Sequence, residues 1–352
     1  MQIVVLFGGC SSEYSVSLKS AAAVLEGMDK SRFTPIPVGI TPEGRWFLYT
    51  GDTQRIAQDA WQGGADCTPA LLSPQRGEHA LLVLRGDTFE RLPVDAVFPV
   101  LHGLCGEDGT VQGLCELAGI PLVGCGTLSS ALCMDKDRAH HLVEAAGIPA
   151  PRSFLVEKGF DTQRLRVQAE ILGYPLFVKP VRSGSSYGVT RVTAPGDLGA
   201  AVAAAFDHDG RVLVEEAIPG FEVGCAVLEN GELMTGEIDE IELSGGFFDY
   251  TEKYNLLTAQ IHVPARVSAQ QADEIKRAAK HIFRALGCRG FARVDLFLTP
   301  AGKIVFNEVN TIPGFTAHSR FPAMLRSAGM PFELVITRAI ETALRDRGGR
   351  CK

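Results

Sequence analysis

The chain has 352 residues, of which 46% are hydrophobic and 21% charged, and its formal net charge is −7. This length allows two or three domains with buried cores, and the composition is that of a soluble α/β protein, not of a disordered or fibrous one. The negative charge argues against nucleic acid as the main partner. No hydrophobic run approaches the ~20 residues of a membrane span and no signal-peptide pattern is present, so we expect a cytoplasmic protein that does not enter a membrane.

The chain opens with an apolar run at residues 2–7, the turn Gly8-Gly9, and a helical pattern over 14–28. This order is typical of a doubly wound unit, in which ligands bind at the carboxyl end of the strand. The glycines equally fit a turn without a ligand, and there is no G-x-G-x-x-G motif. Further strands are predicted at 35–40 and 44–49, and a hairpin around 81–92.

A strand at 96–101 leads into a glycine-rich loop that carries His102, Glu107 and Asp108. This loop either closes on a ligand or caps a helix that begins near residue 111. Another strand is predicted at 119–126, and we place a domain boundary near residue 127.

Residues 128–146 are predicted to form one amphipathic helix, which carries Lys136. A strand at 175–178 leads into Lys179, and a loop of small residues at 182–188 connects it to a strand at 189–192. Close backbone approach and several N–H donors in this loop suit a phosphate, which both lysines could contact. Lone lysines are usually solvated, but Lys179 lies in an apolar run and therefore needs a partner.

An edge-like strand is predicted at 212–216. Its last residues, Glu215 and Glu216, either accept hydrogen bonds from an adenine amino group and ribose hydroxyls or form an exposed strand end. Strands at 222–229 and 232–242, a polar loop at 245–257 and amphipathic helices at 269–286 and 333–347 complete the pattern.

The stretch 291–320 predicts a hairpin with polar residues inside its apolar strands. We expect Arg293 to lie opposite Glu308, so that alternation places both on one face with Asp295 and Asn310. Carboxylate and amide oxygens are ligands that Mg²⁺ takes, whereas a structural network of arginine and carboxylates is the alternative. A one-residue shift of the register would scatter the cluster.

The nine cysteines are odd in number and form no C-x-x-C motif. We therefore expect free, mostly buried thiols and neither a disulfide framework nor a zinc site.

The order of these motifs resembles that of the D-alanine:D-alanine ligases of the ATP-grasp superfamily from end to end. The motifs include GG-x-S-x-E, HG-x-x-GEDG-x-x-QG, MDK, VKP-x-x-x-GSS-x-G and NE-x-N-T-x-PG. Within that family the chain is similar to the D-alanine:D-serine ligases of the G-type vancomycin-resistance group, as in VGCGTLSSALCMDKDRAH (123–140) and ELSGGFFDYTEKY (242–254).

The resemblance implies an α/β protein, α+β in its ATP-binding part, with an ATP-grasp fold behind a doubly wound N-terminal domain. The expected domains are 1–127, 128–220 and 221–352, and the loop 243–258 is expected to close over the site. ATP, two Mg²⁺ or Mn²⁺ ions, D-alanine and D-serine are the implied ligands, and a homodimer is the implied assembly. D-Alanine would attack the γ-phosphate of ATP, and the second amine would then attack the acyl phosphate.

The resemblance also implies a role for each matching residue. The first D-alanine is assigned to Glu13 and His102. The phosphates are assigned to Lys136, Lys179, Gly184, Ser185 and Ser186. Adenine and ribose are assigned to Glu215, Glu216 and Glu222, and the metal ions to Asp295, Glu308 and Asn310. Stabilisation of the reacting oxygens is assigned to Arg293 and the N–H of Gly314. Hydrogen bonds that brace the lid are assigned to Ser185 and Tyr254, and the second substrate's carboxylate to Lys253 and Ser319.

Three residues bear on the second substrate. Tyr254 stands where the lactate-using ligases have a different, His-containing loop, which argues against a depsipeptide product. Phe248 and Arg320 replace the Tyr and the aliphatic residue of ordinary D-alanine:D-alanine ligases. Arg320 offers donors to a serine hydroxyl, and a site built to bond a hydroxyl penalises the analogue without it. The alternatives are that Arg320 faces solvent or pairs with a loop carboxylate, and that the enzyme is an ordinary D-alanine:D-alanine ligase.

Overall fold

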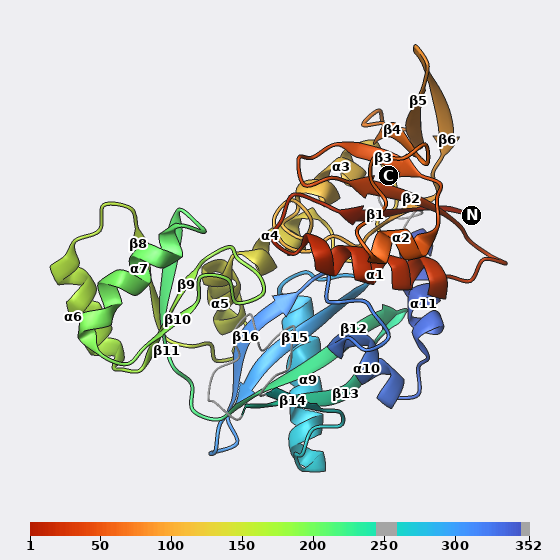
Figure 1. Ribbon diagram of the computed structural model, residues 1–352. Helices are drawn as coiled ribbons and strands as arrows, with labels where there is room; N and C mark the ends of the chain where they lie inside the picture. The colour runs from red at the N-terminus through yellow and green to blue at the C-terminus, as the bar shows by residue number, and fades with distance from the viewer. Residues whose placement is uncertain (244–258, 346–352) are drawn as a thin grey trace.

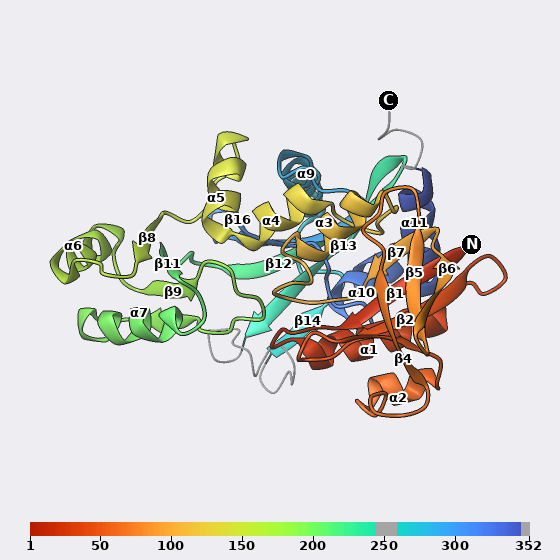
Figure 2. The ribbon, with the colours of Figure 1, turned by 90° about the horizontal axis from the view of Figure 1, so that it is seen from above.

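The structure, a computed structural model, describes residues 1–243 and 259–345 (Figure 1). Within these residues three sheets of seven, four and five strands follow one another along the chain. The four-stranded sheet, with α6 and α7, lies to one side of the molecule in both Figure 1 and Figure 2. The expected mixed α/β architecture is confirmed.

The seven-stranded sheet has the order β6-β5-β4-β3-β2-β1-β7. β1 pairs in parallel with β2 and β7, so the carboxyl ends of these strands meet at one edge. Gly8 ends β1 there with a φ of +86°, and a Cβ at this position would lie 2.2 Å from the carbonyl oxygen of Ile40. Only glycine fits this turn. The elements of this part are β1 (Gln2–Gly8), α1 (Tyr14–Gly27), β2 (Thr34–Ile40), β3 (Trp46–Tyr49), α2 (Thr53–Ala57), β4 (Cys67–Leu72), β5 (Ala80–Arg85), β6 (Thr88–Pro93), β7 (Ala96–Pro99) and α3 (Thr110–Ala118).

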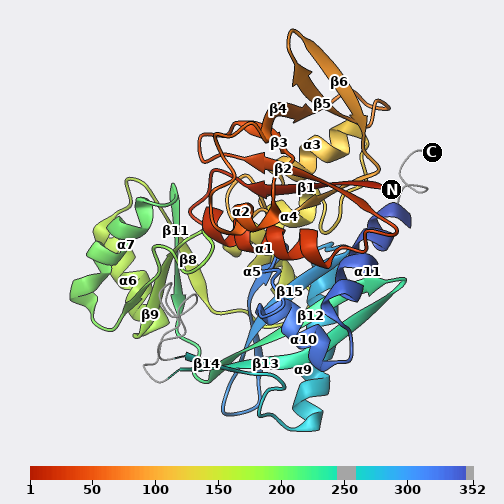
Figure 3. The same ribbon diagram turned by 45° about the vertical axis from the view of Figure 1, so that its right-hand side comes forward.

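The first and last helices of the described chain share one core. α1 and α11 (Phe332–Arg345) lie side by side in Figure 3. Alternate residues of β1, Ile3 and Phe7 among them, are fully buried in the same cluster as Leu18 of α1 and Ile336 of α11. The N-terminal sheet is therefore fixed to the C-terminal part by apolar burial.

The predicted helix over 128–146 is wrong, because the chain forms two helices, α4 (Thr127–Met134) and α5 (Lys136–Ala145). Asp135 between them is extended, and its carboxylate accepts a hydrogen bond from the N–H of Arg138. The same carboxylate forms ion pairs with Arg182 and Arg211. An N-cap residue starts a new helix at this point, so Lys136 becomes the first residue of α5.

The four-stranded sheet has the order β10-β9-β11-β8, and its neighbouring strands are antiparallel. The expectation that residues 212–216 form an edge strand is wrong, because β11 lies between β9 and β8. The elements are β8 (Ser153–Glu157), α6 (Thr162–Leu172), β9 (Leu176–Pro180), β10 (Thr190–Val192), the short 3₁₀ helix η1 (Pro195–Asp197), α7 (Leu198–Phe206) and β11 (Arg211–Glu216).

The five-stranded sheet has the order β14-β13-β12-β15-β16, and α9 packs against it. Its strands, with the two helices that precede α11, are β12 (Phe221–Asn230), β13 (Glu232–Leu243), β14 (Ala259–His262), α9 (Ala269–Ala285), β15 (Phe291–Leu298), β16 (Ile304–Asn310) and α10 (Arg320–Ser327).

The predicted hairpin exists, but its predicted register is wrong. Arg293 pairs with Asn310 and not with Glu308, and Asp295 pairs with Glu308. Near the turn Leu298 pairs with Ile304, one residue beyond the expected register, and Asn307, an extra residue on β16, adds a second residue to the shift at Arg293. A shift of two keeps each side chain on its face, so the four polar residues still lie together.

The predicted strand at 119–126 is present only as an isolated bridge between Val97 and Leu122. No helix within residues 1–243 and 259–345 is long and apolar enough to cross a membrane.

Candidate active site

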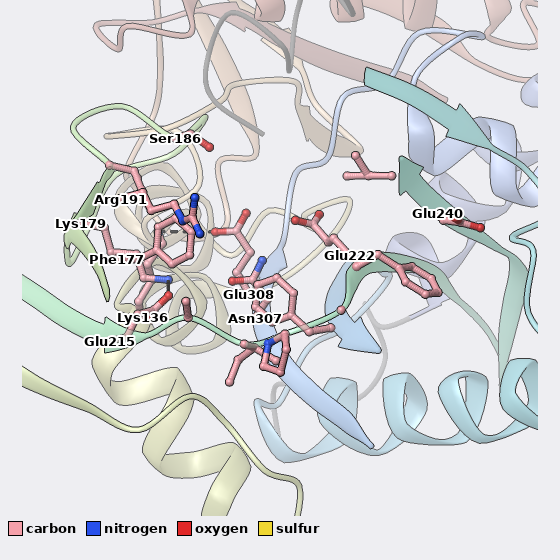
Figure 4. A pocket seen from close by; sticks show the side chains of 18 of the residues that line it. Lys136, Phe177, Lys179, Ser186, Arg191, Glu215, Glu222, Glu240, Asn307 and Glu308 are labelled. Atoms are coloured by element: carbon pink, nitrogen blue, oxygen red, sulfur yellow. Dashed lines mark ion pairs between the residues drawn. The ribbon is translucent and has the colours of Figure 1, made fainter. Parts of the chain in front are cut away.

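A pocket of about 570 Å³ lies between the four-stranded and five-stranded sheets (Figure 4). Its walls come from β9, the loop 182–188, β11 and the 217–220 segment on one side, and from β12, β13 and β16 on the other. Several of the side chains that the sequence singled out line it: Lys136, Lys179, Ser186, Glu215, Glu222 and Glu308.

Lys179 and Glu215 form a buried ion pair in this pocket. Leu213 of β11 lies opposite Lys179 of β9, so Glu215 is the diagonal neighbour on the same face. The Lys179 ammonium lies 2.6 Å from Glu215 Oε1, and both side chains are less than 10% exposed. The second carboxylate oxygen, Oε2, is buried and has no hydrogen-bond partner among the described residues. A buried acceptor of this kind suits a ligand N–H or O–H donor.

Glu216, the next residue, points the other way. Its carboxylate pairs with the largely exposed Arg152 at 2.7 Å. The structure therefore separates Glu216 from Glu215, and only Glu215 lines the pocket.

Lys136 joins three parts of the site. Its ammonium donates to the carbonyl oxygen of Ser183 at 2.6 Å and lies 3.6 Å from the Glu308 carboxylate. Its position at the start of α5 follows from the helix break at Asp135. The lysine thus lies between the 182–188 loop and the hairpin of β15 and β16.

The 182–188 loop contacts the N-terminal sheet through Glu13. The Ser185 hydroxyl donates to Glu13 Oε1, and a Cβ on Gly184 would lie 2.5 Å from Glu13 Oε2. Ser185 and Ser186 have φ values of +52° and +60°. Left-handed backbone at consecutive non-glycine residues is strained, and such strain is common in loops that bind ligands.

Three carboxylates influence one another where the N-terminal sheet meets the hairpin. Burial, followed by the nearby carboxylates of Glu13 and Glu308, raises the pKa of Glu107 well above its ordinary value, whereas Lys136 lowers it. Clustered negative charge of this kind favours cations, such as an ammonium group or a divalent ion.

His102 lies beside this cluster and is buried. Its Nδ1 lies 2.8 Å from the carbonyl oxygen of Ile312, and its Nε2 lies 3.3 Å from the Ser20 hydroxyl. A carbonyl only accepts, so Nδ1 carries the proton. Burial lowers the pKa of His102, although Glu13 acts in the opposite direction.

The hairpin brings Arg293, Asp295 and Asn310 into one hydrogen-bonded group. Arg293 donates to both Asp295 oxygens, at 2.8 Å from Nε to Oδ1 and 2.7 Å from Nη2 to Oδ2, and Asn310 Nδ2 donates to Oδ2 at 2.9 Å. Asp295 is fully buried, whereas Glu308 faces the pocket. The predicted arginine–carboxylate network is therefore present at the predicted metal ligands.

Arg320 is buried in a carboxylate network. Its Nε and Nη2 donate to Asp239 at 2.6 and 2.8 Å, Nη1 donates to Glu222 at 3.1 Å, and Nη2 lies 3.3 Å from Asp295. Among the described residues its partners are strand carboxylates of β12, β13 and β15, and the side chain is buried from solvent.

The other predicted residues divide into two groups. Ser319 lies close to Gly314, because a Cβ on Gly314 would be 3.1 Å from its hydroxyl. Phe248, Lys253 and Tyr254 lie outside the described residues.

Sequence reasoning missed Asp239, which is fully buried in β13, and the pair of Glu240 with Arg266 at 2.6 Å on the pocket wall. Two acidic residues between Ile238 and Ile241 in a predicted strand were a usable signal, similar to the one that identified Asp295.

Sequence comparisons place the whole chain in one family. The model for the D-ala D-ala ligase N-terminus matches residues 2–125, and the model for the D-ala D-ala ligase C-terminus matches residues 142–341. The chain belongs to the D-alanine–D-alanine ligase family. The family consists of ATP-dependent ligases, so the ATP-grasp fold and the ligase class expected from the sequence are confirmed.

Relatives within this ligase family differ in the substrate that their names give. The crystal structure of the VanG D-Ala:D-Ser ligase from Enterococcus faecalis is 52% identical, covers 97% of this chain and 99% of that one, and superposes with a TM-score of 0.90. A putative D-alanine–D-lactate ligase of Streptomyces coelicolor is 45% identical over 98% of both chains. A D-alanine–D-alanine ligase of Caldicellulosiruptor bescii is 42% identical over 98% of this chain and 95% of its own.

The donor set of this ligase fits Mg²⁺. No three His, Cys, Asp or Glu side chains of the described ranges 1–243 and 259–345 converge as a metal-binding group. The expected ligands, however, are two carboxylates and the amide oxygen of Asn310, which are hard oxygen donors. Mg²⁺ commonly takes one or two protein carboxylates together with substrate phosphates, which matches a pocket that Glu308 lines beside Lys136.

Proposed function

We propose that the protein is a ligase that joins D-alanine to D-serine at the expense of ATP, through a D-alanyl phosphate. The observation that carries D-serine as the second substrate is the 52% identity to the VanG D-Ala:D-Ser ligase over nearly the whole chain. Arg320 supports the same substrate, because its guanidinium offers N–H donors to a serine hydroxyl oxygen. The product would enter altered peptidoglycan precursors and confer vancomycin resistance.

In this proposal Glu13 binds the ammonium of the first D-alanine. Its carboxylate is held by Ser185, so the amino acid sits where the N-terminal sheet meets the 182–188 loop. His102, neutral and hydrogen-bonded through Nδ1, forms the wall of the site beside this amino acid. The substrate carboxylate is thereby oriented toward the pocket in which ATP binds, and orientation is a large part of rate enhancement.

The nucleotide occupies the pocket between the two sheets. Glu215 and Glu222 bind adenine and ribose, and Lys136, Lys179 and the backbone of residues 184–186 bind phosphates. Asp295, Glu308 and Asn310 would hold Mg²⁺, which would supply positive charge to neutralise the phosphoryl oxygens. Arg293 and the N–H of Gly314 then stabilise the oxyanion that forms when the second amine attacks.

The proposal also covers the domain boundaries, the cellular location and the oligomeric state of the protein. We assign domains at 1–127, 128–220 and 221–352, a cytoplasmic location and a homodimer.

The decisive experiment measures ATP-dependent phosphate release with D-alanine alone and with added D-serine or D-lactate, with the products identified by mass spectrometry. D-Alanyl-D-serine as the main mixed product supports the proposal. A product of D-alanine alone, with D-serine left unused, shows an ordinary D-alanine:D-alanine ligase. D-Alanyl-D-lactate would assign the chain to the class of the Streptomyces coelicolor relative.

A further inference from the structure

The extra residue in β16 has a backbone carbonyl that β15 does not pair with, and a side chain of α5 donates to it instead. Asn307 has no partner in the pairing of β15 with β16, so its backbone carbonyl needs a donor from elsewhere. The carbonyl oxygen of Asn307 accepts instead from His140 Nε2, at 3.0 Å. Because a carbonyl only accepts, Nε2 carries the proton in this contact.

The side chain of His140 is held in position for its hydrogen bond to the Asn307 carbonyl. It is 2% exposed, and its ring meets the ring of Phe306 edge to face with centroids 5.6 Å apart. Lys136 lies one turn earlier on the same face of α5 and reaches Glu308 at 3.6 Å. One face of α5 therefore contacts both the bulged residue and the carboxylate next to it.

The bulge decides where Glu308 points. Without the extra residue the register would move by one, and Glu308 and Asn310 would turn to the face opposite Asp295. We propose that His140 is a positioning residue that holds the bulge at Asn307 and thereby keeps Glu308 and Asn310 beside Asp295 as a divalent-cation site. This inference rests on the proposed function for the metal ligands, but its test does not depend on the substrates.

The test measures Mn²⁺ binding to the nucleotide-free protein by electron paramagnetic resonance of the free ion, together with thermal denaturation. We compare His140→Leu, which has similar bulk and no donor, with His140→Gln, whose amide can donate to the same carbonyl. His141→Leu is the matched control, because His141 is the next residue on the helix and its side chain is 72% exposed. Loss of a group that orients metal ligands typically weakens metal binding about 10–100-fold.

We expect His140→Leu to weaken Mn²⁺ binding by about tenfold, with His140→Gln and His141→Leu close to the unmodified protein. Unchanged Mn²⁺ affinity in a folded His140→Leu protein would overturn the inference, even if its melting temperature fell, because packing alone would explain that result. Equal losses in the Leu and Gln variants, or no protein-bound Mn²⁺ before substitution, would also overturn it. If the protein makes no dipeptide but the Leu and Gln variants differ as stated, the proposed function fails and the inference stands.

Discussion

The Arg320 guanidinium forms a two-point hydrogen-bonded pair with the Asp239 carboxylate, with Nε 2.6 Å from Oδ2 and Nη2 2.8 Å from Oδ1. Asp239 is fully buried. Removal of one partner of a buried pair leaves the other charge without compensation, which is costlier than loss of both. A substrate-selecting role for Arg320 must therefore be tested apart from its structural role.

We expect Arg320→Leu to lower the free energy of unfolding by about 3–5 kcal/mol and Arg320→Leu/Asp239→Asn to recover part of this loss. Chemical denaturation measures both, with the partly exposed Arg338→Leu as the control. The ratio of D-serine to D-alanine incorporation should fall in the double variant as well. A stable double variant with an unchanged ratio would remove Arg320 as the selector.

Substitutions of the adjacent residues Glu215 and Glu216 can be compared directly, because Glu215 is in a buried ion pair and Glu216 pairs with an exposed arginine. Glu215→Gln leaves the buried Lys179 without its counter-charge, so we expect a higher KM for ATP and a loss of stability of several kcal/mol, on the order of 3–5. Glu216→Gln affects only the pair with the exposed Arg152, worth about 0–1 kcal/mol. Steady-state kinetics measure the KM for ATP, and thermal denaturation measures the stability of each variant. Equal increases in the KM for ATP in the two variants would contradict the assignment of Glu215 alone to the pocket.

Gly184→Ala should damage the first-substrate site selectively. The new Cβ would lie 2.5 Å from Glu13 Oε2, so Glu13 must move. We expect kcat/KM for D-alanine to fall about tenfold, equivalent to about 1.4 kcal/mol, with a smaller change in the KM for ATP. The control is Gly199→Ala, since nothing lies within 4 Å of a Cβ there. Unaltered D-alanine kinetics in Gly184→Ala would argue against Glu13 as the ammonium ligand.

Acid should destabilise the protein through its buried histidines. Burial lowers the pKa values of His102 and His140 below the ordinary 6.5. The unfolded chain then binds protons at higher pH than the folded chain, so this contribution to stability is complete above pH 6.5 and is lost as the pH falls below it. In His140→Gln the slope of unfolding free energy against pH should be smaller by up to about 1.4 kcal/mol per pH unit.

Urea unfolding at about pH 7, 6 and 5 measures this slope. The exposed His141→Gln serves as the control and should leave the slope unchanged. A slope in His140→Gln equal to that of the unmodified protein would show that His140 titrates in the same range whether the chain is folded or not.

Local patterns predicted much of the fold. The apolar run at 2–7, the helix over 14–28 and the hairpin at 291–310 are present within a residue or two. Lys179 was expected to need a partner because it interrupts an apolar strand, and it has one. The prediction of one helix over 128–146 was wrong, although the residues on both sides of Asp135 have a helical pattern. Asp135 leaves the helix because its carboxylate pairs with Arg182 and Arg211, which are distant in sequence.

The sequence by itself determined which side chains had to be satisfied inside the protein: Lys179, Arg293, Asp295 and Glu308 each interrupt an apolar strand, and burial of a charge is costly wherever that strand lies. Only the tertiary structure decided what satisfies them. Strand order placed Glu215 beside Lys179 and put Asp239 beneath Arg320, and the bulge at Asn307 returned Glu308 to the face of Asp295. These pairings depend on contacts between residues far apart in the chain, which local periodicity does not encode.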